Sequence, residues 1–318
     1  MSVSVASVTV TFNAADVLLP QLEALLHQSR PLEEIIVVDN ASSDGTSAMI
    51  AERFPQVTLL QMPENLGVGA GLAAGLTYAA LQKHHDWVWT FDQDSVPKRD
   101  ALEALLTGTD SLEEGEGVVG IAAALPVHEQ SGACYPPLIW RDGFVKPSTE
   151  QLKQPIWFAD LVITSGCMVR REVVEKVGLP RADFFMDFVD FEYCLRARSS
   201  GYRIAVITKA QFAHEIGNAR EVRFPGYFQL WPNHAPWREY YMSRNMTYAA
   251  WELYGNPGTK RFVVRHLARH AGGVILFGTN KLACLLKMAQ GFYDGRRAFL
   301  GIRFRPGDLP RPANAKSE

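Results

Sequence analysis

Two aspartates that are one residue apart, Asp92 and Asp94, follow an apolar run in the stretch "WVWTFDQDSVP". Two like charges about 4 Å apart repel by roughly 4 kcal/mol at an effective dielectric near 20, so the pair needs a cation or hydrogen-bond donors. A D-x-D turn can offer one carboxylate to Mg²⁺ or Mn²⁺ and the other to the sugar or ribose of a nucleotide. The alternative is a solvated turn, because this short motif also occurs by chance.

A second candidate is Asp39 in "VVDNASSDGT", which lies at the tip of a predicted strand and could accept a hydrogen bond from a base or ribose. The residues after it predict a turn into a helix. Simple helix capping by Ser43, Asp44 and Thr46 is the alternative explanation for those residues. Capping does not explain Asp39, which therefore stays a candidate ligand-binding residue.

A glycine-rich segment, "ENLGVGAGLAAGL", starts a predicted helix after the third strand. It is similar to a phosphate-binding loop, but it lacks the lysine of a P-loop and the last glycine of the dinucleotide fingerprint. Two interpretations stay open. The glycines either bring the backbone close to a ligand or let the helix pack tightly on the sheet.

The segment "FFMDFVDFEYCLRARSSGY" places Asp187, Asp190 and Glu192 among aromatic residues. Apolar surroundings raise the pKa of a carboxylate, which suits a general base. The alternative is a helix N-terminus, where the helix dipole favours acidic residues. His214 ends a later strand and could ligate a metal, although a lone histidine is more often a packed or surface residue.

These residues need elements that bring them together, and the pattern of short apolar runs separated by helical segments supplies them. Alternating strands and helices predict right-handed crossovers and a mainly parallel α/β sheet with helices on both faces. Ligands of such sheets bind beyond the carboxyl ends of the strands. The predicted strands are Ser7–Asn13, Glu34–Asn40, Val57–Pro63, Trp87–Asp92, Val118–Leu125 and Arg203–Ile207; the predicted helices are Asp16–Gln28, Thr46–Phe54, Gly67–Lys83 and Arg99–Leu112, with a short one from Arg171.

The domain organisation follows from the same pattern. We predict a catalytic domain over residues 1–230, a helical region over 231–305 and a flexible Pro-rich tail over 306–318. The chain is nearly neutral, with 32 basic and 34 acidic residues, and no global field indicates a nucleic-acid partner. Between Gly258 and Arg305, however, ten basic residues face one acid, Asp294, which predicts an anionic surface as a partner of the helical region.

The four cysteines have no spacing typical of metal or redox sites, and no signal peptide precedes the first strand, so we expect reduced thiols in the cytosol. Residues 271–289 are apolar, but Asn280, Lys281 and Lys287 interrupt the run. This interruption excludes the segment as a membrane-spanning helix.

Taken together, these segments resemble the inverting family 2 glycosyltransferases with a GT-A fold. The resemblance runs in order over roughly residues 5–250 and rests on "VTFN", "VVDNASSDGT", "ENLG", "FDQDS", "TSGCMVRR", "FMDFVDFEYCLRA", "FAHEIGN" and "REYYMSRN". It implies a divalent metal, Mg²⁺ or Mn²⁺, held by Asp94 and His214. It implies the following further roles: Asp190 as the catalytic base; Thr11, Asn13, Asp39, Asn65, Gly67, Asp92 and Asp94 as donor-binding residues; and Ser165, Gly166 and Glu192 as acceptor-binding residues.

Within that family, "FDQDS", "FMDFVDFEYCLRA" and "REYYMSRN" are most similar to bacterial rhamnosyltransferases that use dTDP-rhamnose in surface polysaccharide synthesis. Ala73 departs from their pattern, because those proteins often have asparagine there. The segment "NLGVGAGLAAG" is instead similar to galactofuranosyltransferases that use UDP-galactofuranose. The resemblance therefore implies a nucleoside-diphosphate sugar donor and leaves its identity open between these two.

A lipid-linked saccharide acceptor would place the enzyme at the inner face of the plasma membrane, where the basic helical region could contact anionic lipid. We expect interfacial or sugar-stacking aromatic residues there, namely Trp231, Trp237, Tyr240, Tyr241, Phe262 and Phe277. The alternative is that these helices pack on the catalytic domain or form a homo-oligomer contact. Two rival classes are a nucleotidyltransferase, which would need a Gly-rich basic loop that "TFNAADVLLP" lacks, and a non-catalytic nucleotide-sugar-binding module.

Overall fold

The computed structural model describes residues 3–112, 117–128, 134, 136–141, 143–214, 219–224 and 227–306. The chain divides into two compact units. Unit 1 comprises Met1–Ala182 and Val189–Glu215, and unit 2 comprises Asp183–Phe188 and Ile216–Glu318. Except for residue 306, the predicted tail over 306–318 lies outside the described residues.

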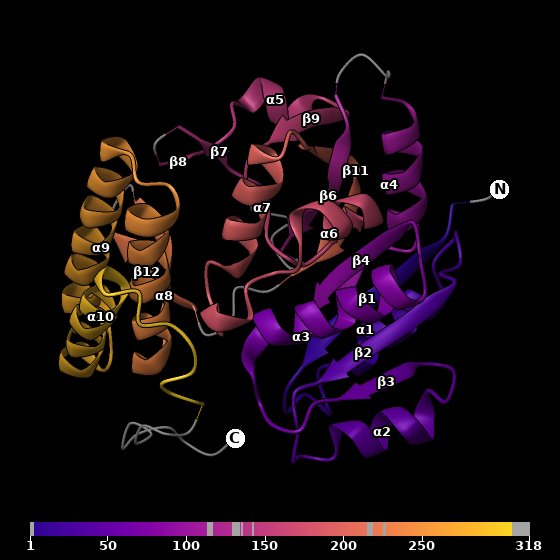
Figure 1. Cartoon of the computed structure of the whole chain (residues 1–318), viewed down its shortest axis with the longest axis horizontal. Helices are drawn as coiled ribbons and strands as arrows, with labels where there is room; N and C mark the ends of the chain where they lie inside the picture. The colour runs from indigo at the N-terminus through magenta and orange to yellow at the C-terminus, as the bar shows by residue number, and fades with distance from the viewer. Residues whose placement is uncertain are drawn as a thin grey trace. The chain divides into compact units, whose positions relative to one another are not determined.

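Unit 1 alternates strands and helices in the predicted order (Figure 1). Its elements are β1 (Val5–Thr11), α1 (Leu19–Leu26), β2 (Glu34–Asp39), α2 (Thr46–Arg53), β3 (Thr58–Gln61), α3 (Gly67–Leu76), the π-helical turn Thr77–Gln82, β4 (Trp87–Asp92), β5 (Val96–Pro97), α4 (Ala101–Asp110), β6 (Val119–Val127), β7 (Ile139–Trp140), β8 (Phe144–Val145), α5 (Thr149–Lys153), β9 (Ile156–Ala159), β10 (Cys167–Arg170), α6 (Arg171–Val177), α7 (Val189–Ser199) and β11 (Arg203–Ala213).

The main sheet has the order β3-β2-β1-β4-β10-β6-β11-β5, and β9 also pairs with β11. The first four strands are parallel, as predicted. The second half is mixed, because β10 runs antiparallel between β4 and β6, and β5 and β9 run antiparallel to β11. The α/β class is therefore confirmed, with a sheet that is less parallel than the sequence indicated.

Helices cover both faces of this sheet. Leu22 and Leu25 of α1 and Leu105 of α4 belong to one core cluster with alternate residues of the strands. On the other face, α3 packs directly on β1: a Cβ on Gly71 would lie 2.6 Å from Val10, and one on Gly75 would lie 2.3 Å from a methyl group of Val8. Close helix packing thus accounts for these two glycines of the Gly-rich segment.

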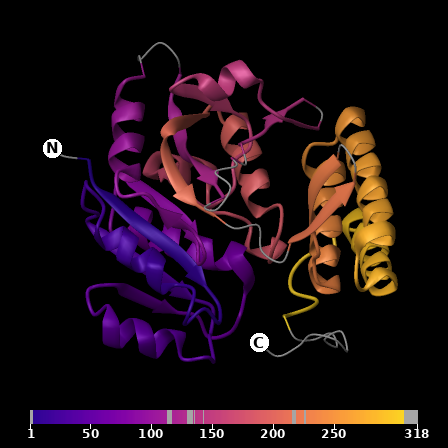
Figure 2. The same cartoon turned by 180° about the vertical axis from the view of Figure 1, so that it is seen from behind.

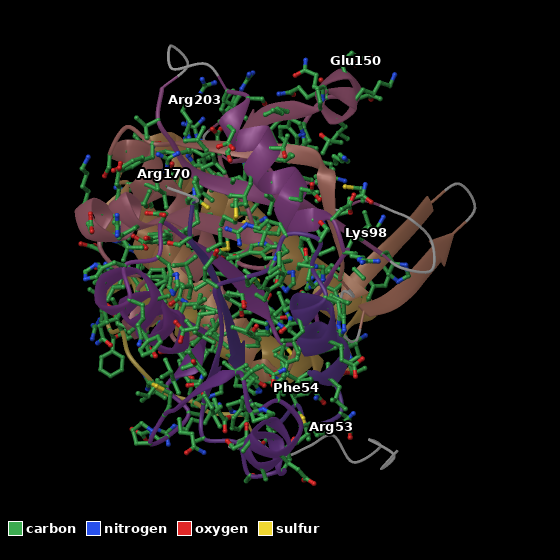
Figure 3. The ribbon with its side chains drawn as sticks, turned by 90° about the vertical axis from the view of Figure 1, so that its right-hand side faces the viewer. Arg53, Phe54, Lys98, Glu150, Arg170 and Arg203 are labelled. Atoms are coloured by element: carbon green, nitrogen blue, oxygen red, sulfur yellow. The ribbon has the colours of Figure 1, made fainter. Side chains whose placement is uncertain are left out.

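Two arginine side chains lie over aromatic rings at the end of the sheet where the parallel strands begin. Arg170, at the end of β10, lies over the ring of Trp87 at 4.8 Å from its centroid, and Arg203, at the start of β11, lies over Phe158. Both arginines are labelled in Figure 3. Cation–π contacts therefore cover this end of the sheet. The polar residues that are candidates for ligand binding lie at the opposite ends of β1, β2 and β4.

The described part of unit 2 contains the helices α8 (Pro236–Tyr248), α9 (Pro257–Phe277) and α10 (Lys281–Arg296), and a hairpin of β12 (Ala219–Phe224) and β13 (Tyr227–Pro232) (Figures 1 and 2). Helix α8 packs along α10 because α10 presents glycines: a Cβ on Gly291 or Gly295 would lie 2.3 or 2.4 Å from the carbonyl oxygens of Tyr240 and Arg244. A C-terminal helical region is present from α8 onward, and Trp231 lies in a strand, β13, that was not expected. A π-helical turn, Ala249–Leu253, directly follows α8.

Arg244 and Asn245, the "RN" of "REYYMSRN", are fully buried and hold the loop Asp183–Phe188. Arg244 Nη2 donates to the carbonyl oxygens of Asp183 and Phe184 at 3.0 and 2.9 Å. Asn245 Nδ2 donates to the carbonyl oxygens of Phe184, Met186 and Asp187 at 3.0, 2.8 and 2.8 Å. The loop needs these donors because three of its residues, Phe185, Asp187 and Phe188, have positive φ angles of 60–64°.

The expected interfacial role is wrong for three of the aromatic residues. Tyr240 and Tyr241 have no exposed surface, and Trp231 is 8% exposed. The tyrosine hydroxyls bond to Asp294 and to the backbone of Phe304, so these side chains belong to the core of unit 2. Among the described residues, no helix is both long and apolar enough to cross a membrane.

Candidate active site

Asp39 ends β2 and is 2% exposed. Ser42 donates to Asp39 Oδ1 through its backbone N–H, at 3.1 Å, and through its hydroxyl, at 2.5 Å; the Ser47 hydroxyl donates to Oδ2. Helix α2 has Gly45 at its N-cap, with φ 92° and no side-chain cap. Asp44 nevertheless caps the first turn, because its Oδ1 accepts from the Thr46 N–H at 3.1 Å. The Ser42 and Ser47 hydroxyls instead orient the Asp39 carboxylate, which capping does not explain.

The end of β1 is tied to the end of β2 through Asn13. Its backbone N–H donates to Ser42 Oγ at 2.8 Å, and its Oδ1 accepts from the Ser43 N–H at 2.9 Å. Asn13 has a φ of 48°, a left-handed conformation that asparagine tolerates better than most residues. The predicted donor-binding residues of the first two strands thus lie side by side.

The turn of Asp92 and Asp94 is held by two glutamines. Gln93 Oε1 accepts from Thr11 Oγ1 at 3.1 Å and from the Phe12 N–H at 2.8 Å, which joins the turn to β1. Gln21, buried on α1, donates through Nε2 to the carbonyl oxygens of Asp92 and Ser95. Sequence reasoning missed Gln21, because nothing distinguishes it from an ordinary helical residue.

Ser165 and His214 complete this turn. Ser165 Oγ accepts from the Asp92 N–H at 2.7 Å and from the Ser95 hydroxyl at 2.9 Å. Ser95 Oγ also lies 2.9 Å from His214 Nδ1, which is 3.8 Å from Asp94 Oδ1. Sequence reasoning did not single out Ser95, although it directly follows the D-x-D motif.

The pair of Asp94 and His214 has the right donors for a divalent cation. A carboxylate oxygen and an imidazole nitrogen lie next to each other, and 41% of the Asp94 side chain is exposed. Mg²⁺ and Mn²⁺ sites in nucleotide enzymes often use one or two protein groups and complete their coordination with phosphate oxygens and water. The two residues therefore fit a metal that is shared with a bound diphosphate.

Asp190 lies in the first turn of α7 and lines a small cavity of about 40 Å³. Most of the cavity wall is apolar. The wall is formed by nine apolar or aromatic residues, namely Leu72, Leu76, Ile121, Val162, Ile163, Val169, Pro180, Val189 and Tyr193, and by Thr90, Thr164, Cys167 and Cys194 beside Asp190. Burial, and to a smaller degree Cys194, Asp190 and Asp92, raise the pKa of the Cys167 thiol. Thr90 of β4 and Cys167 of β10 line the same cavity as Asp190, so Asp190 lies near the end of β4.

Glu192 is 2% exposed, and Arg196 donates to its two oxygens at 2.8 and 2.9 Å. Arg196 also donates to the carbonyl oxygens of Val177 and Leu179, so the ion pair joins α7 to the end of α6. An acceptor contact by Glu192, as expected from the sequence, would require this buried pair to open. Gly166 has a φ of 74°, and a Cβ there would lie 2.4 Å from the Phe212 ring, so local packing requires this glycine.

The loop before α3 is also joined to β2. Asn65 Oδ1 accepts from the Gly67 N–H at 3.0 Å, and the Gly67 carbonyl accepts from Asn40 Nδ2 at 3.1 Å. Gly67 has a φ of 84°, which favours glycine. Asn40 Oδ1 is buried and has no hydrogen-bond partner among the described residues. An oxygen that can accept a hydrogen bond thus lies beside the residues expected to bind the sugar nucleotide.

Comparisons with known proteins agree with this geometry. Residues 7–178 match the family model described as "Glycosyl transferase family 2". The chain is 28% identical to dTDP-rhamnosyl transferase RfbF of Shigella flexneri over 250 residues, which cover 77% of this chain and 79% of that protein. It is 25% identical to galactofuranosyltransferase GlfT1 of Mycolicibacterium smegmatis over 224 residues, which cover 67% and 71% of the two chains.

The fold is similar to that of a solved structure of GalNAc-T7 with UDP, GalNAc and Mn²⁺, with a TM-score of 0.61 and 12% identity. The match covers 93% of this chain and 56% of that one. The family match spans more than half of the chain and contains the ends of β1, β2 and β4 described above. The fold is thus GT-A with a C-terminal helical region, and the chain belongs to glycosyl transferase family 2 and is a glycosyltransferase.

Proposed function

We propose that the protein transfers a sugar from a nucleoside-diphosphate donor to a hydroxyl group of a saccharide or lipid-linked saccharide, with inversion at C1, in cell-surface polysaccharide synthesis. One observation carries this proposal. The hydrogen bonds of Asn13, Gln93 and Ser165 tie the ends of β1, β2 and β4 to the loop before β10, and Asp190 lies beside the same loop. The residues that we propose for donor binding and for the base thus lie at the same end of the strands.

In this reaction, Asp190 accepts the proton of the acceptor hydroxyl. The hydroxyl oxygen forms a bond to C1 of the sugar while the bond between C1 and the diphosphate oxygen breaks on the opposite face. The nucleoside diphosphate leaves with the bonding electrons, so a single displacement inverts C1. Asp39, held by its serines, binds the nucleobase, while Asp92 binds the ribose or the sugar and Thr11, Asn13, Asn65 and Gly67 line the donor site. Ser165 and Gly166 border the acceptor.

Asp94 and His214 would hold Mg²⁺ or Mn²⁺ together with the donor phosphates. When bound, the cation would neutralise the charge that grows on the departing diphosphate. The carboxylate oxygen and the imidazole nitrogen of these two residues support this assignment, as does the Mn²⁺ in the GalNAc-T7 structure.

L-Rhamnose from dTDP-rhamnose is the preferred donor, because the rhamnosyl transferase of Shigella flexneri covers more of the chain at higher identity. Galactofuranose from UDP-galactofuranose is the second candidate, since GlfT1 also matches and Ala73 departs from the rhamnosyltransferase pattern.

A small panel of sugar nucleotides tests the donor. We expect dTDP-rhamnose with Mn²⁺ to raise the free energy of unfolding by about 2.7 kcal/mol at ~100 times its dissociation constant, measured by thermal unfolding. UDP-glucose and GDP-mannose serve as controls. Protection by UDP-galactofuranose alone would select the second donor, and no protection by any sugar nucleotide would contradict the proposal.

The membrane association that we propose uses an apolar tip where α9 meets α10, defined by Ile275, Leu276, Leu282 and Leu286, which are 53–72% exposed. Lys281 lies within it, and a basic side chain near an anionic surface contributes about 1 kcal/mol. The wild-type chain should sediment with phosphatidylserine vesicles at low salt and lose this binding at high salt. The variant Leu282→Glu/Leu286→Glu should fail to bind, whereas Val17→Glu on unit 1 should bind normally.

If the tip is instead a homo-oligomer contact, the double variant would lower the mass of the particle in solution. The wild-type chain would then show no salt-sensitive vesicle binding. That result would contradict the peripheral membrane location and leave the transfer reaction untouched.

A further inference from the structure

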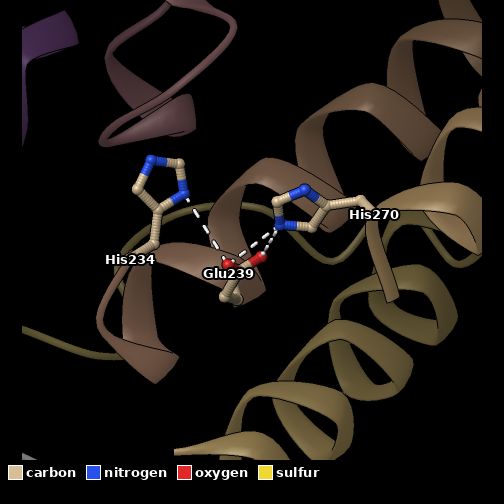
Figure 4. A group of neighbouring side chains, drawn as sticks. All are labelled: His234, Glu239 and His270. Carbon is tan, nitrogen blue, oxygen red and sulfur yellow. Dashed lines mark hydrogen bonds and ion pairs between the residues drawn. The ribbon is translucent and has the colours of Figure 1, made fainter. Parts of the chain in front are cut away.

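Three side chains that the proposed reaction does not use converge in unit 2 (Figure 4). His234 follows β13, Glu239 lies in the first turn of α8, and His270 lies in the middle of α9. His270 Nε2 is 3.0 and 2.9 Å from the two oxygens of Glu239, and His234 Nδ1 is 3.7 Å from Glu239 Oε1. One ligand atom from each of the three lies within 4.8 Å of the others.

The cluster is buried and carries a carboxylate. The side chains of Glu239, His270 and His234 are 2%, 10% and 20% exposed. Removing a carboxylate from water is costly unless a cation or hydrogen-bond donors neutralise it. His234 Nδ1 is buried and makes no hydrogen bond with the described residues, so a ring nitrogen is available beside the carboxylate.

Neighbouring side chains hold the histidines in place. The ring of His270 stacks on Trp231, with centroids 5.1 Å apart and an angle of 22° between the planes. Trp231 fits there because α9 has Gly273, where a Cβ would lie 1.9 Å from the indole. The carbonyl of His234 accepts a weak hydrogen bond from the Cys284 thiol of α10 at 3.8 Å. The orientation of the rings is thus built into the core of unit 2.

We propose that His234, Glu239 and His270 bind a divalent first-row transition cation, with Zn²⁺ as the best match. Bonds of about 2.0–2.1 Å in a tetrahedral zinc site put neighbouring ligand atoms roughly 3.3 Å apart. The contacts of 2.9–3.7 Å around Glu239 bracket that spacing. Two imidazoles favour such metals over Mg²⁺ or Ca²⁺, which prefer oxygen, so the ion differs in kind from the one expected at Asp94.

The cation would connect three elements of unit 2, namely the end of the β12–β13 hairpin, the start of α8 and the middle of α9. A metal that binds only the folded chain adds its binding free energy to the stability of the fold. The site therefore stabilises unit 2 and is independent of the proposed transfer reaction. The alternative is a hydrogen-bonded His–Glu–His cluster that needs no metal.

The test uses the full chain without a histidine tag, stripped with a chelator and dialysed. Titration with Co²⁺, which reports its ligands through visible absorption, should show saturable binding that Zn²⁺ displaces, and Zn²⁺ alone should raise the unfolding temperature. His270→Gln and Glu239→Gln should weaken Co²⁺ binding by more than the roughly 10–100-fold typical of indirect neighbours of a metal.

Two matched controls separate this site from others. His266→Gln changes a histidine one turn earlier on α9, and His214→Gln removes the imidazole expected at the donor site; both should retain the Co²⁺ absorption. Absence of saturable Co²⁺ binding to the wild-type chain would overturn the proposal even if a variant failed to fold. Loss of the signal in His214→Gln with retention in His270→Gln would also overturn it, because the metal would then lie in unit 1.

Discussion

The two units differ in where the side chains of their candidate sites lie. In unit 1, polar side chains gather at the carboxyl ends of β1, β2 and β4, over a core of apolar residues. In unit 2, the polar side chains lie in the core itself, where Arg244, Asn245 and Glu239 are at most 1% exposed. A polar group at a strand end can contact a ligand from solvent, whereas a polar group inside a helical core bonds to its buried neighbours.

Two carboxylates show the consequence. The side chain of Asp94 is 41% exposed and lies beside one histidine, while the side chain of Glu239 is 2% exposed and lies beside two. A carboxylate that shares a metal with an exchanging substrate, as proposed for Asp94, needs access to solvent, and one that stabilises a core does not. Changes at the strand ends of unit 1 should therefore affect binding and reaction, and changes in the core of unit 2 should affect unfolding.

The largest effect is expected for Asp190→Asn. The amide cannot take the acceptor proton, and general base catalysis typically contributes 10²–10⁴-fold, so kcat should fall by about that factor. Donor binding, measured by thermal protection, should stay within twofold of the wild type. Asp100→Asn, at an exposed position on the same unit, serves as the control. Full activity in Asp190→Asn would show that Asp190 is not the catalytic base.

The next largest effect is expected for Asn245→Leu. The leucine has a similar size but removes the donor of the Met186 and Asp187 carbonyl groups, whereas Arg244 still donates to the carbonyl of Phe184. The free energy of unfolding should therefore fall by about 3 kcal/mol. Urea unfolding measures this loss. Asn280→Ala changes an asparagine that makes no capping bond and should cost much less. Equal stability of the two variants would show that the polar core of unit 2 is not structural.

Asp94→Ala should weaken donor binding by roughly 10–100-fold, or about 1.4–2.7 kcal/mol, and only when Mn²⁺ is present. The expected cause is the loss of a metal ligand, so the affinity measured by calorimetry with a chelator should match that of the wild type. Stability without ligand should not change, since Asp94 is half exposed. A loss that is equal with and without Mn²⁺ would argue against a metal at this turn.

The smallest effect concerns pH. Burial, followed by Arg269 and His270, lowers the pKa of His266 to about 4, and burial followed by Arg238 lowers that of His234. The unfolded chain then binds more protons between pH 6.5 and about 4, so the free energy of unfolding should fall as the pH drops through this window. Because His266 is only partly buried, its share should be on the order of 1–2 kcal/mol.

Urea unfolding in the presence of a chelator measures this slope. His266→Gln should flatten it, while His27→Gln, at an exposed position of unit 1, should not. An unchanged slope in His266→Gln would assign the pH dependence to other groups.

The sequence by itself determined the alternation of elements and the polar residues at the strand ends. These features are local: continuous apolar runs end at Asp39 and Asp92, and parallel strands bring their carboxyl ends together. The antiparallel insertion of β10, the serines that orient Asp39 and the burial of Tyr240 and Tyr241 were not predicted, because each depends on which surfaces pack together.

Only the tertiary structure decided which side chains meet. Gln21 contacts Asp92 across 71 positions, Ser95 contacts His214 across 119, and Glu239 meets His270 across 31. No spacing in the sequence marks such pairs, since a helix or strand specifies the face on which a residue lies and not the distant residue opposite it. Close packing of the elements determines which distant residues meet. For example, glycines let α3 approach β1 and let α10 approach α8.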